Sequence, residues 1–351
     1  MNINDLFVKA VNEQVSDVFI VAGRPISFRK NGIIRTIDEE RLLPQNTDEM
    51  LHDIYKLAGN RDFSQLANEG DDDFSFAIPG VSRFRVSAYK QRGSYSAVIR
   101  IITFTLPDPE KLGIPESVVS LCHALNGMIL VTGTAGSGKS TTLACMIDRI
   151  NHTRDAHIIT LEDPLEYLHR HDRCIVSQRE INVDTENYVT ALRASLRQSP
   201  DVILLGEMRD YETIEVAMTA AETGHLLLST LHTLGAANTI NRIIDVFPAN
   251  QQQQIAIQLS TTLNAVISQQ LVPTVDDQMV PAFEIMTVTP AIRNMIRERK
   301  IPQIEGLVYA SSRPDMTSMD SSLLKLYQTG RITRDTALTY AINHEMLEKK
   351  M

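Results

Sequence analysis

The segment MILVTGTAGSGKSTTL, residues 128–143, combines three glycines with a lysine and several hydroxyl side chains. An apolar run typical of a short buried strand comes first, and the spacing from Gly133 to Ser140 is G-x-x-x-x-G-K-S. Glycines let several backbone N–H groups turn toward one point, and a following helix favours an anion at its N-terminus. In such a loop Lys139 contacts the β- and γ-phosphates of a nucleotide, and the Ser140 hydroxyl binds Mg²⁺.

The alternative for this segment is a glycine-rich connection without a ligand, but the complete spacing favours a nucleotide site. ATP and Mg²⁺ are therefore the expected ligands, with a helix opening at about Thr141. The expected contact residues are Gly133, Thr134, Ala135, Gly136, Ser137, Gly138, Lys139, Ser140 and Thr141.

Glu207 follows the apolar run of DVILLGEMRD, residues 201–210. Ligands of open α/β sheets bind beyond the carboxyl ends of the strands, so a carboxylate here can orient a water molecule or help to hold Mg²⁺. In the usual Walker B motif an acid stands at the preceding position, which is Gly206 in this chain. The alternative is a solvated acid after a strand.

A second acidic group follows another apolar run, in IITLEDPLEY, residues 158–167. Glu162, Asp163 and Glu166 fall within five positions, which suggests handling of metal and water, although a polar turn is an equal alternative. The expected metal ligands are Ser140, Glu162, Asp163 and Glu207, with Glu166 and Glu207 as catalytic candidates.

Two histidines, His225 and His232, bracket the apolar run LLLSTL. A histidine at a strand end can donate a hydrogen bond to a γ-phosphate, whereas a lone histidine is more often structural. Because two of them flank one strand, we expect both to be functional.

The composition is that of an ordinary globular protein of two domains, with 351 residues, 43% hydrophobic and 22% charged. No apolar stretch is long enough to span a bilayer and the start lacks a signal-like core, so a cytoplasmic protein is expected. Cys122, Cys145 and Cys174 are far apart and should be packed singly rather than bound to zinc or to one another. The net charge of −9 argues against nucleic acid as a partner.

The pattern along the chain predicts two domains joined by a linker. Residues 1–105 alternate strands and helices in an α+β domain with an Asn31-Gly32 hairpin, and the proline-rich residues 106–115 are typical of a linker. Residues 116–351 begin as an α/β domain, in which short apolar runs indicate buried parallel strands. After Phe247-Pro248 the pattern becomes mostly helical, with residues 250–271 expected as one helix.

Four segments together resemble the secretion-type ATPase superfamily. GTAGSGKSTT, TLEDPLEY, GEMRD and TGHLLLSTLHT are similar to its Walker A motif, Asp box, atypical Walker B motif and His box. Within it the chain resembles the retraction ATPases of type IV pili, through SDVFIVAGRPISFRKNG and through AIRNMIRERKIPQI, which is similar to the AIRNLI motif. Phe19, where histidine is usual, and Ala135, where proline is usual, depart from the pattern.

The resemblance implies a RecA-like P-loop core behind a PAS-like N-terminal domain, assembled as a homohexameric ring. Nucleotide would bind at the domain junction, within reach of Arg83, Arg85 and Arg100; the alternative for these arginines is pairing with the acids at 71–73. The implied function is Mg²⁺-dependent ATP hydrolysis that powers pilus retraction and twitching motility. The implied partners are an inner-membrane pilus platform protein and other pilus ATPases, and the implied place is the cytoplasmic face of the membrane at the pilus base.

Four other functions compete with this interpretation. An accessory retraction paralogue shares the same core, and only the AIRNMI segment speaks against it. A pilus-assembly or type II secretion ATPase would carry a longer N-terminal region and a four-cysteine zinc insertion. A nucleic-acid motor would need a basic and aromatic track. A non-catalytic scaffold would not need Lys139, Ser140 and Glu207 together.

Overall fold

The computed structural model describes residues 2–30, 32–102, 106–276, 278–313 and 315–351. The chain forms two compact units, Met1–Thr105 and Leu106–Met351. Residues 106–115, predicted as an interdomain linker, group with the second unit. Ile114 is 5% exposed in the core of that unit, and the Cys145 thiol donates to the Pro107 carbonyl at 3.4 Å.

The first unit is an antiparallel sheet covered by helices, in the strand order β3-β2-β1-β6-β5-β4. Its core includes Phe7 and Phe84, both fully buried. The predicted hairpin is present, with Gly32 at a φ of 77°; Asn31 lies outside the described residues. The elements are α1 (Ile3–Asn12), β1 (Asp17–Ile20), β2 (Ser27–Lys30), β3 (Ile33–Thr36), α2 (Pro44–Leu57), α3 (Ser64–Glu69), β4 (Asp71–Ile78), β5 (Ser82–Gln91) and β6 (Ser94–Ile102).

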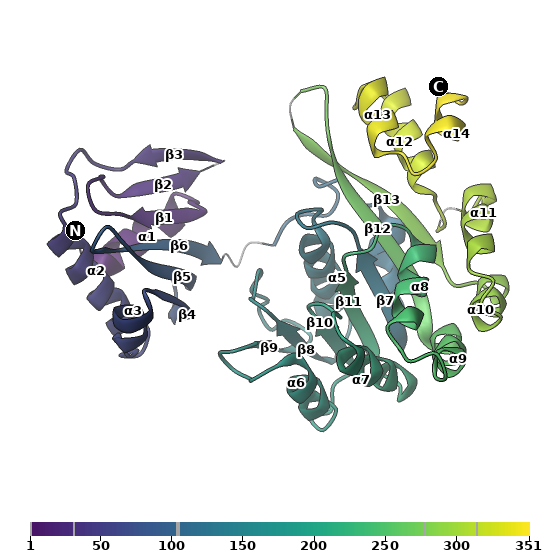
Figure 1. Cartoon of the computed structure of the whole chain (residues 1–351), viewed down its shortest axis with the longest axis horizontal. Helices are drawn as coiled ribbons and strands as arrows, with labels where there is room; N and C mark the ends of the chain where they lie inside the picture. The colour runs from purple at the N-terminus through teal and green to yellow at the C-terminus, as the bar shows by residue number, and fades with distance from the viewer. Residues whose placement is uncertain (1, 31, 103–105, 277, 314) are drawn as a thin grey trace. The chain divides into compact units, whose positions relative to one another are not determined.

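The second unit is built on a seven-stranded sheet in the order β13-β12-β7-β11-β10-β8-β9, labelled in Figure 1. The pairs from β12 to β9 are parallel, and β7, β8, β10 and β11 among them are the apolar runs predicted as parallel strands. Only β13 is antiparallel to its neighbour. The strands are β7 (Gly127–Thr132), β8 (His157–Glu162), β9 (Ile175–Glu180), β10 (Val202–Leu205), β11 (Leu226–Leu231), β12 (Leu263–Pro273) and β13 (Met279–Thr287).

Helices cover both faces of this sheet. Met128 and Leu130 of β7 pack in one cluster with the helices from α6 to α11, while Ile129 and Val131 pack on the other face with α4 and α5. The helices are α4 (Glu116–Val119), η1 (Ser120–His123), α5 (Lys139–Thr153), α6 (Tyr188–Ser195), α7 (Tyr211–Glu222), α8 (Ala236–Asp245), α9 (Gln252–Thr262), α10 (Pro290–Arg297), α11 (Pro302–Ala310), α12 (Met319–Gln328), α13 (Arg334–Tyr340) and α14 (His344–Glu348).

The expectation of one helix over 250–271 was wrong for its second half. Helix α9 ends at Thr262, and β12 begins at Leu263. β12 pairs with β7 on one side and with β13 on the other, so its backbone groups are satisfied in the sheet. A short apolar run fits a strand or a helix equally well, and here the tertiary pairing decided.

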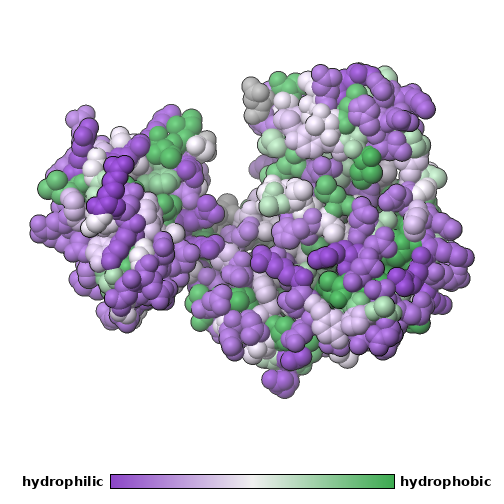
Figure 2. Space-filling view, viewed as in Figure 1, coloured by the Kyte–Doolittle hydropathy of each residue, from purple (hydrophilic) through white to green (hydrophobic). Residues whose placement is uncertain are grey.

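One face of the molecule is largely hydrophilic and the cysteines are buried, as expected for a globular chain of this composition. Figure 2 shows this face, with scattered apolar residues. Among the described residues, no helix combines the length and apolar character that crossing a bilayer requires. The three cysteines are buried and free, which confirms the prediction that they are packed singly.

Candidate active site

A cavity of about 530 Å³ lies where the carboxyl ends of the central parallel strands meet. Four parts of the chain reach it: residues 133–140 after β7 (the phosphate-loop segment), residues 162–166 at the end of β8 (the acidic segment), the segment after β10 and the end of β11. They meet there because parallel strands end on one edge of the sheet. The lining residues are Ala135, Gly136, Gly138, Lys139, Ser140, Thr141, Glu162, Asp163, Pro164, Glu166, Tyr188, Gly206, Glu207, Arg209, Thr230, His232 and Leu271.

Two glycines of the phosphate-loop segment, Gly133 and Gly138, stand where a larger side chain would clash or strain the backbone. A Cβ at Gly133 would lie 2.2 Å from the Gln269 carbonyl oxygen and 2.6 Å from the Ser137 hydroxyl. Gly138, at a φ of 88°, is the N-cap of α5, which begins at Lys139 rather than at the expected Thr141. A side chain larger than the hydrogen of glycine would therefore clash at Gly133 and strain the backbone at Gly138.

Lys139 lies inside this loop and is only 8% exposed. Its ammonium group donates to the carbonyl oxygens of Gly133 and Thr134 at 2.9 and 2.8 Å. Burial lowers the pKa of Lys139, while the nearby carboxylates Glu207 and Glu166 raise it. Gly133, Thr134 and Ser137 do not line the cavity, although the sequence grouped them with the contact residues; the first two hold Lys139 through their carbonyls.

Glu207 is held between two basic side chains. One carboxylate oxygen lies 2.6 Å from Arg209 Nη2 and the other 3.0 Å from His232 Nε2, and the side chain is 14% exposed. The structure thus brings together two residues that the sequence singled out, from the adjacent strands β10 and β11. Sequence reasoning missed Arg209, whose signal was its position two residues after Glu207.

Gly206 has a steric reason to replace the usual acid. A Cβ there would lie 2.8 Å from the Tyr188 hydroxyl oxygen and 3.2 Å from the Leu161 carbonyl oxygen. An aspartate at 206 would need Tyr188 to move. Tyr188, also missed from sequence, lines the cavity, and burial together with the carboxylates of Glu207 and Asp163 raises its pKa.

The acidic segment offers carboxylates in different environments. Burial raises the pKa of Glu162 to about 7, while the neighbouring Thr160 and Gln178 side chains oppose that rise. Asp163 and Glu166 are exposed along the cavity. Mg²⁺ is usually bound by few protein ligands together with substrate phosphates. The Ser140 hydroxyl and these carboxylates on one cavity fit that pattern, and among the described residues no cluster of three or more acidic, histidine or cysteine side chains forms a metal site of its own.

The expectation for His225 needs correction. His225 precedes β11, and its backbone carbonyl accepts a hydrogen bond from the N–H of Gly127 at the start of β7. Its ring Nδ1 lies 2.9 Å from the Ala220 carbonyl oxygen. His225 is therefore at the amino edge of the sheet and does not line the cavity with His232, because the two ends of one strand lie on opposite edges.

The three predicted arginines lie in the first unit. Arg85 of β5 stands opposite Arg100 of β6, and Arg83 shares the face of Arg85. Arg100 donates to the buried Asp17 at 3.1 Å, and Arg29 lies 3.6 Å from the same carboxylate.

The alternative pairing with residues 71–73 is not what the structure shows for Arg100. Asp72 accepts hydrogen bonds from Arg61 and Tyr55 instead.

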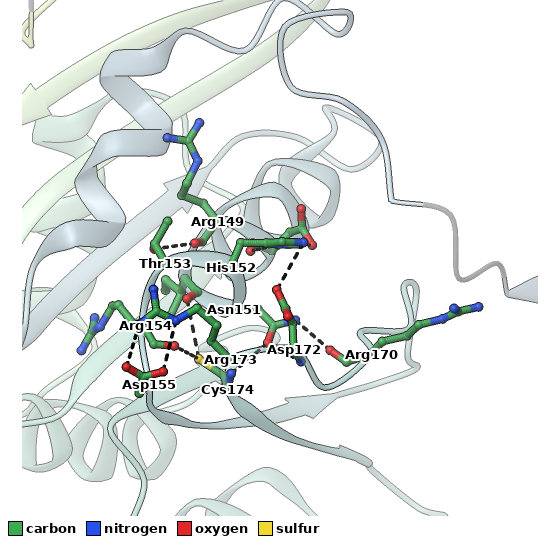
Figure 3. Close-up of polar contacts among 12 residues, drawn as sticks. Arg149, Asn151, His152, Thr153, Arg154, Asp155, Arg170, Asp172, Arg173 and Cys174 are labelled. Carbon is green, nitrogen blue, oxygen red and sulfur yellow. Dashed lines mark hydrogen bonds and ion pairs between the residues drawn. The ribbon is translucent and has the colours of Figure 1, made fainter.

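The far end of α5 is fixed to the loop after the acidic segment, as Figure 3 shows. Asn151 donates to the Arg170 carbonyl at 2.7 Å, and the Cys174 thiol donates to the Arg154 carbonyl at 3.0 Å. His152 lies between Asp148 and Asp172, at 3.3 and 3.7 Å. These contacts tie the helix of the phosphate-loop segment to the loop that follows Glu166.

Comparison with known proteins agrees with this geometry. Residues 1–325 match the family described as Type II/IV secretion system protein. The chain is 42% identical to the type IV pilus retraction ATPase PilT of Pseudomonas aeruginosa over 96% of this chain and 97% of that protein. It is 39% identical to the type IV pilus ATPase PilU of the same organism, over 97% and 89%. A crystal structure of the pilus retraction motor PilT with bound ADP superposes with a TM-score of 0.90 at 44% identity, covering 99% of both chains.

Proposed function

The chain belongs to the Type II/IV secretion system protein family, and we propose that it is the ATPase that powers type IV pilus retraction. The observation that carries the proposal is the cavity in which Lys139, Glu207 and His232 meet, on a chain that aligns with a retraction ATPase along almost its whole length. ATP is the substrate that this set of side chains suits.

The residues divide the work of hydrolysis. The Lys139 ammonium exchanges its two carbonyl partners for phosphate oxygens, and the backbone N–H groups of 136–140 surround the β-phosphate. Ser140 with Glu162, Asp163 or Glu207 would hold Mg²⁺, which would neutralise charge on the phosphates. Glu166 and Glu207 orient the attacking water and Glu207 accepts its proton, while His232 fixes Glu207 through the 3.0 Å contact.

The ring assembly belongs to the same proposal. A homohexamer places arginines of the first unit, Arg83, Arg85 and Arg100, against nucleotide, where they stabilise charge on the transferring phosphoryl group. Charge-assisted contacts of this kind form and break with nucleotide state, so hydrolysis changes the orientation of the units. The proposed partners are an inner-membrane pilus platform protein and other pilus ATPases, at the cytoplasmic face of the membrane.

One alternative has a specific observation in its favour. The identity to PilU is nearly as high as that to PilT, so an accessory role beside a second retraction ATPase is the competing function. A pilus-assembly or type II secretion ATPase is the more distant candidate.

The test combines catalysis, assembly and motility. We expect the purified protein to be hexameric at about micromolar concentration, and Lys139→Ala to abolish turnover without loss of fold. Mixing inactive Lys139→Ala subunits with inactive Arg100→Ala subunits should restore turnover if Arg100 acts on a neighbour's nucleotide. A fully active monomer would contradict the ring motor.

Expression in cells whose retraction ATPase is deleted separates retraction from the accessory role. A retraction ATPase restores twitching without any other retraction ATPase in the cell, whereas an accessory protein restores it only when the main retraction ATPase is present. Replacing Arg293 and Asn294 on α10 with alanine should leave ATP turnover largely intact and impair retraction, because only Ile292 and Ile296 of this helix are buried. Loss of both would mean that α10 is needed for the catalytic fold.

A further inference from the structure

Glu284 of β13 is a buried carboxylate outside the catalytic cavity, 8% exposed. It accepts a hydrogen bond from the N–H of Ala236 at 2.7 Å, and it lines a cavity together with Met319. Ala236 is the first residue of α8 and Met319 the first of α12, so one carboxylate lies by the N-termini of two helices. Negative charge at a helix N-terminus is favourable.

On the α8 side, Glu284 binds a helix start that follows His232 closely in the chain. Residues 233–235 are the whole connection between His232 and α8. The Gly235 N–H donates to the Ser268 hydroxyl at 2.9 Å, and the Thr239 hydroxyl donates to the Gly235 carbonyl at 2.8 Å. Because the connection is short and bonded at its end, a shift in the start of α8 shifts His232 against Glu207.

On the other side, the edge of β13 holds the C-terminal helices. Ile285 and Thr317 exchange two backbone hydrogen bonds, at 2.8 and 2.9 Å, and the Phe283 N–H donates to the Ser322 hydroxyl at 3.1 Å. The buried Asp320 accepts from the N–H groups of Ile342 and Asn343, which precede α14. Figure 1 shows α12, α13 and α14 together beyond the β12–β13 ribbon.

A cavity of about 390 Å³ adjoins these bonds and is lined by Glu284, Asp320 and the loop start of α8. Its presence means that the beginnings of α8 and α12 are not packed tightly on that side. Coupling between sites is carried by contiguous hydrogen-bonded and packed networks, and such connections lie on both sides of Glu284, next to a cavity that leaves room for a shift.

We propose that Glu284 is a positioning residue for ATP hydrolysis, which ties the segment carrying His232 to the first turn of α12. When hydrolysis at the γ-phosphate moves His232, the helices α12–α14 then move as well. In the other direction, a partner that moves these helices changes the contact between His232 and Glu207. The inference rests on the proposed ATPase function and names the residue that would link its chemistry to the C-terminal helices.

The test is hydrogen exchange on the full-length protein with ADP and with a non-hydrolysable ATP analogue. The wild type should show slower exchange at 133–145 with either nucleotide, and a difference between the two nucleotides at 232–242 and at 319–348. Glu284→Gln, which removes the negative charge beside both helix starts, should lose the difference at 319–348. Its kcat should fall about tenfold while KM stays within about twofold, as expected when positioning rather than binding is lost.

Glu305→Gln is the matched control, because Glu305 lines the same cavity but is exposed. It should keep the wild-type kcat and exchange pattern. Asp320→Asn approaches the same connection from α12 and should lower kcat without changing KM, which keeps the proposal testable if Glu284→Gln folds poorly.

Two outcomes overturn different claims. Absence of protection at 133–145 would remove the ATPase proposal itself. Protection there with no nucleotide-dependent difference at 319–348 in the wild type, or with that difference intact in Glu284→Gln, would remove the role of Glu284 alone.

Discussion

The two sheets of this protein place their polar residues in different ways. In β5 of the first unit, Phe84 and Val86 are buried while Arg83 and Arg85 share the opposite face. In β7 and β11 of the second unit every position is buried, so the polar residues that do chemistry stand beyond the strand ends.

Polar residues at strand ends and polar residues on a sheet face are held in place by different neighbours. Residues at strand ends converge from several strands onto one cavity, and each has its own partners, as Glu207 has Arg209 and His232. Residues on a sheet face are supported by lateral neighbours, as Arg29 and Arg100 share Asp17. Substitutions in the second unit should therefore affect turnover more than stability, and substitutions on the face in the first unit should spread a smaller effect over both.

The largest effect is expected at Glu207. Glu207→Gln should slow hydrolysis by roughly a hundredfold or more, the scale of losing a positioned base, and leave nucleotide affinity within a few-fold. Single-turnover kinetics and nucleotide titration measure the two quantities separately. Glu212→Gln, an exposed acid in the first turn of α7, is the control and should be neutral. A parallel loss of binding and turnover would make Glu207 a structural or metal residue.

Gly206→Ala tests whether shape at the strand end matters as much as charge. The new methyl group would lie 2.8 Å from the Tyr188 hydroxyl oxygen, so we expect about 1–3 kcal/mol lower unfolding free energy and roughly tenfold lower kcat. Denaturant unfolding and steady-state turnover measure both.

Adding Tyr188→Phe to Gly206→Ala removes the nearest atom and should recover part of the loss. Gly306→Ala, in a helix with open space around its Cβ, is the control and should not destabilise. If Gly206→Ala keeps the wild-type stability and kcat, crowding does not explain why glycine stands at position 206 in place of the usual acid.

Asp17→Asn probes the lateral support of the first sheet. The buried carboxylate holds Arg100 at 3.1 Å, and an amide would weaken that contact. We expect about 1–2 kcal/mol lower unfolding free energy and a few-fold lower kcat, because Arg100 loses its fixed position. Asp71→Asn, exposed on β4, is the control. If only stability changes, the arginine face does not contribute to hydrolysis in the way we propose.

The smallest effect concerns His152. Its pKa is raised by the Asp148 carbonyl and by the carboxylates of Asp148 and Asp172. The charged ring therefore stabilises the folded state at a pH below its ordinary pKa, and this contribution is lost as the pH rises through the raised pKa of the folded protein.

Because His152 is 57% exposed, the contribution should stay below about 1 kcal/mol. The unfolding free energy of the wild type should exceed that of His152→Asn at about pH 6, and the gap should close at about pH 8.5. His123→Asn, which lies outside this cluster, is the control. An equal difference in unfolding free energy at both pH values would mean that the charge of His152 does not contribute to the contacts between α5 and the loop at 170–174.

Much of the fold could be predicted because its signals are local. The four apolar runs became β7, β8, β10 and β11 because a fully buried strand needs apolar side chains on both faces. The missed strand β12 shows the limit: residues 263–273 look alike as helix or strand until β7 and β13 offer their backbone groups.

The sequence by itself determined which chemical groups the chain carries and that the acids, Lys139 and His232 follow apolar runs, since spacing and residue type are local properties. The tertiary structure alone decided which of them meet. Strand order placed His232 beside Glu207. His225 lies at the opposite edge because it precedes the same strand that His232 follows. The tertiary structure also placed the Tyr188 hydroxyl oxygen 2.8 Å from where a Cβ at position 206 would lie. Such pairings depend on segments distant in the chain, so no local pattern records them.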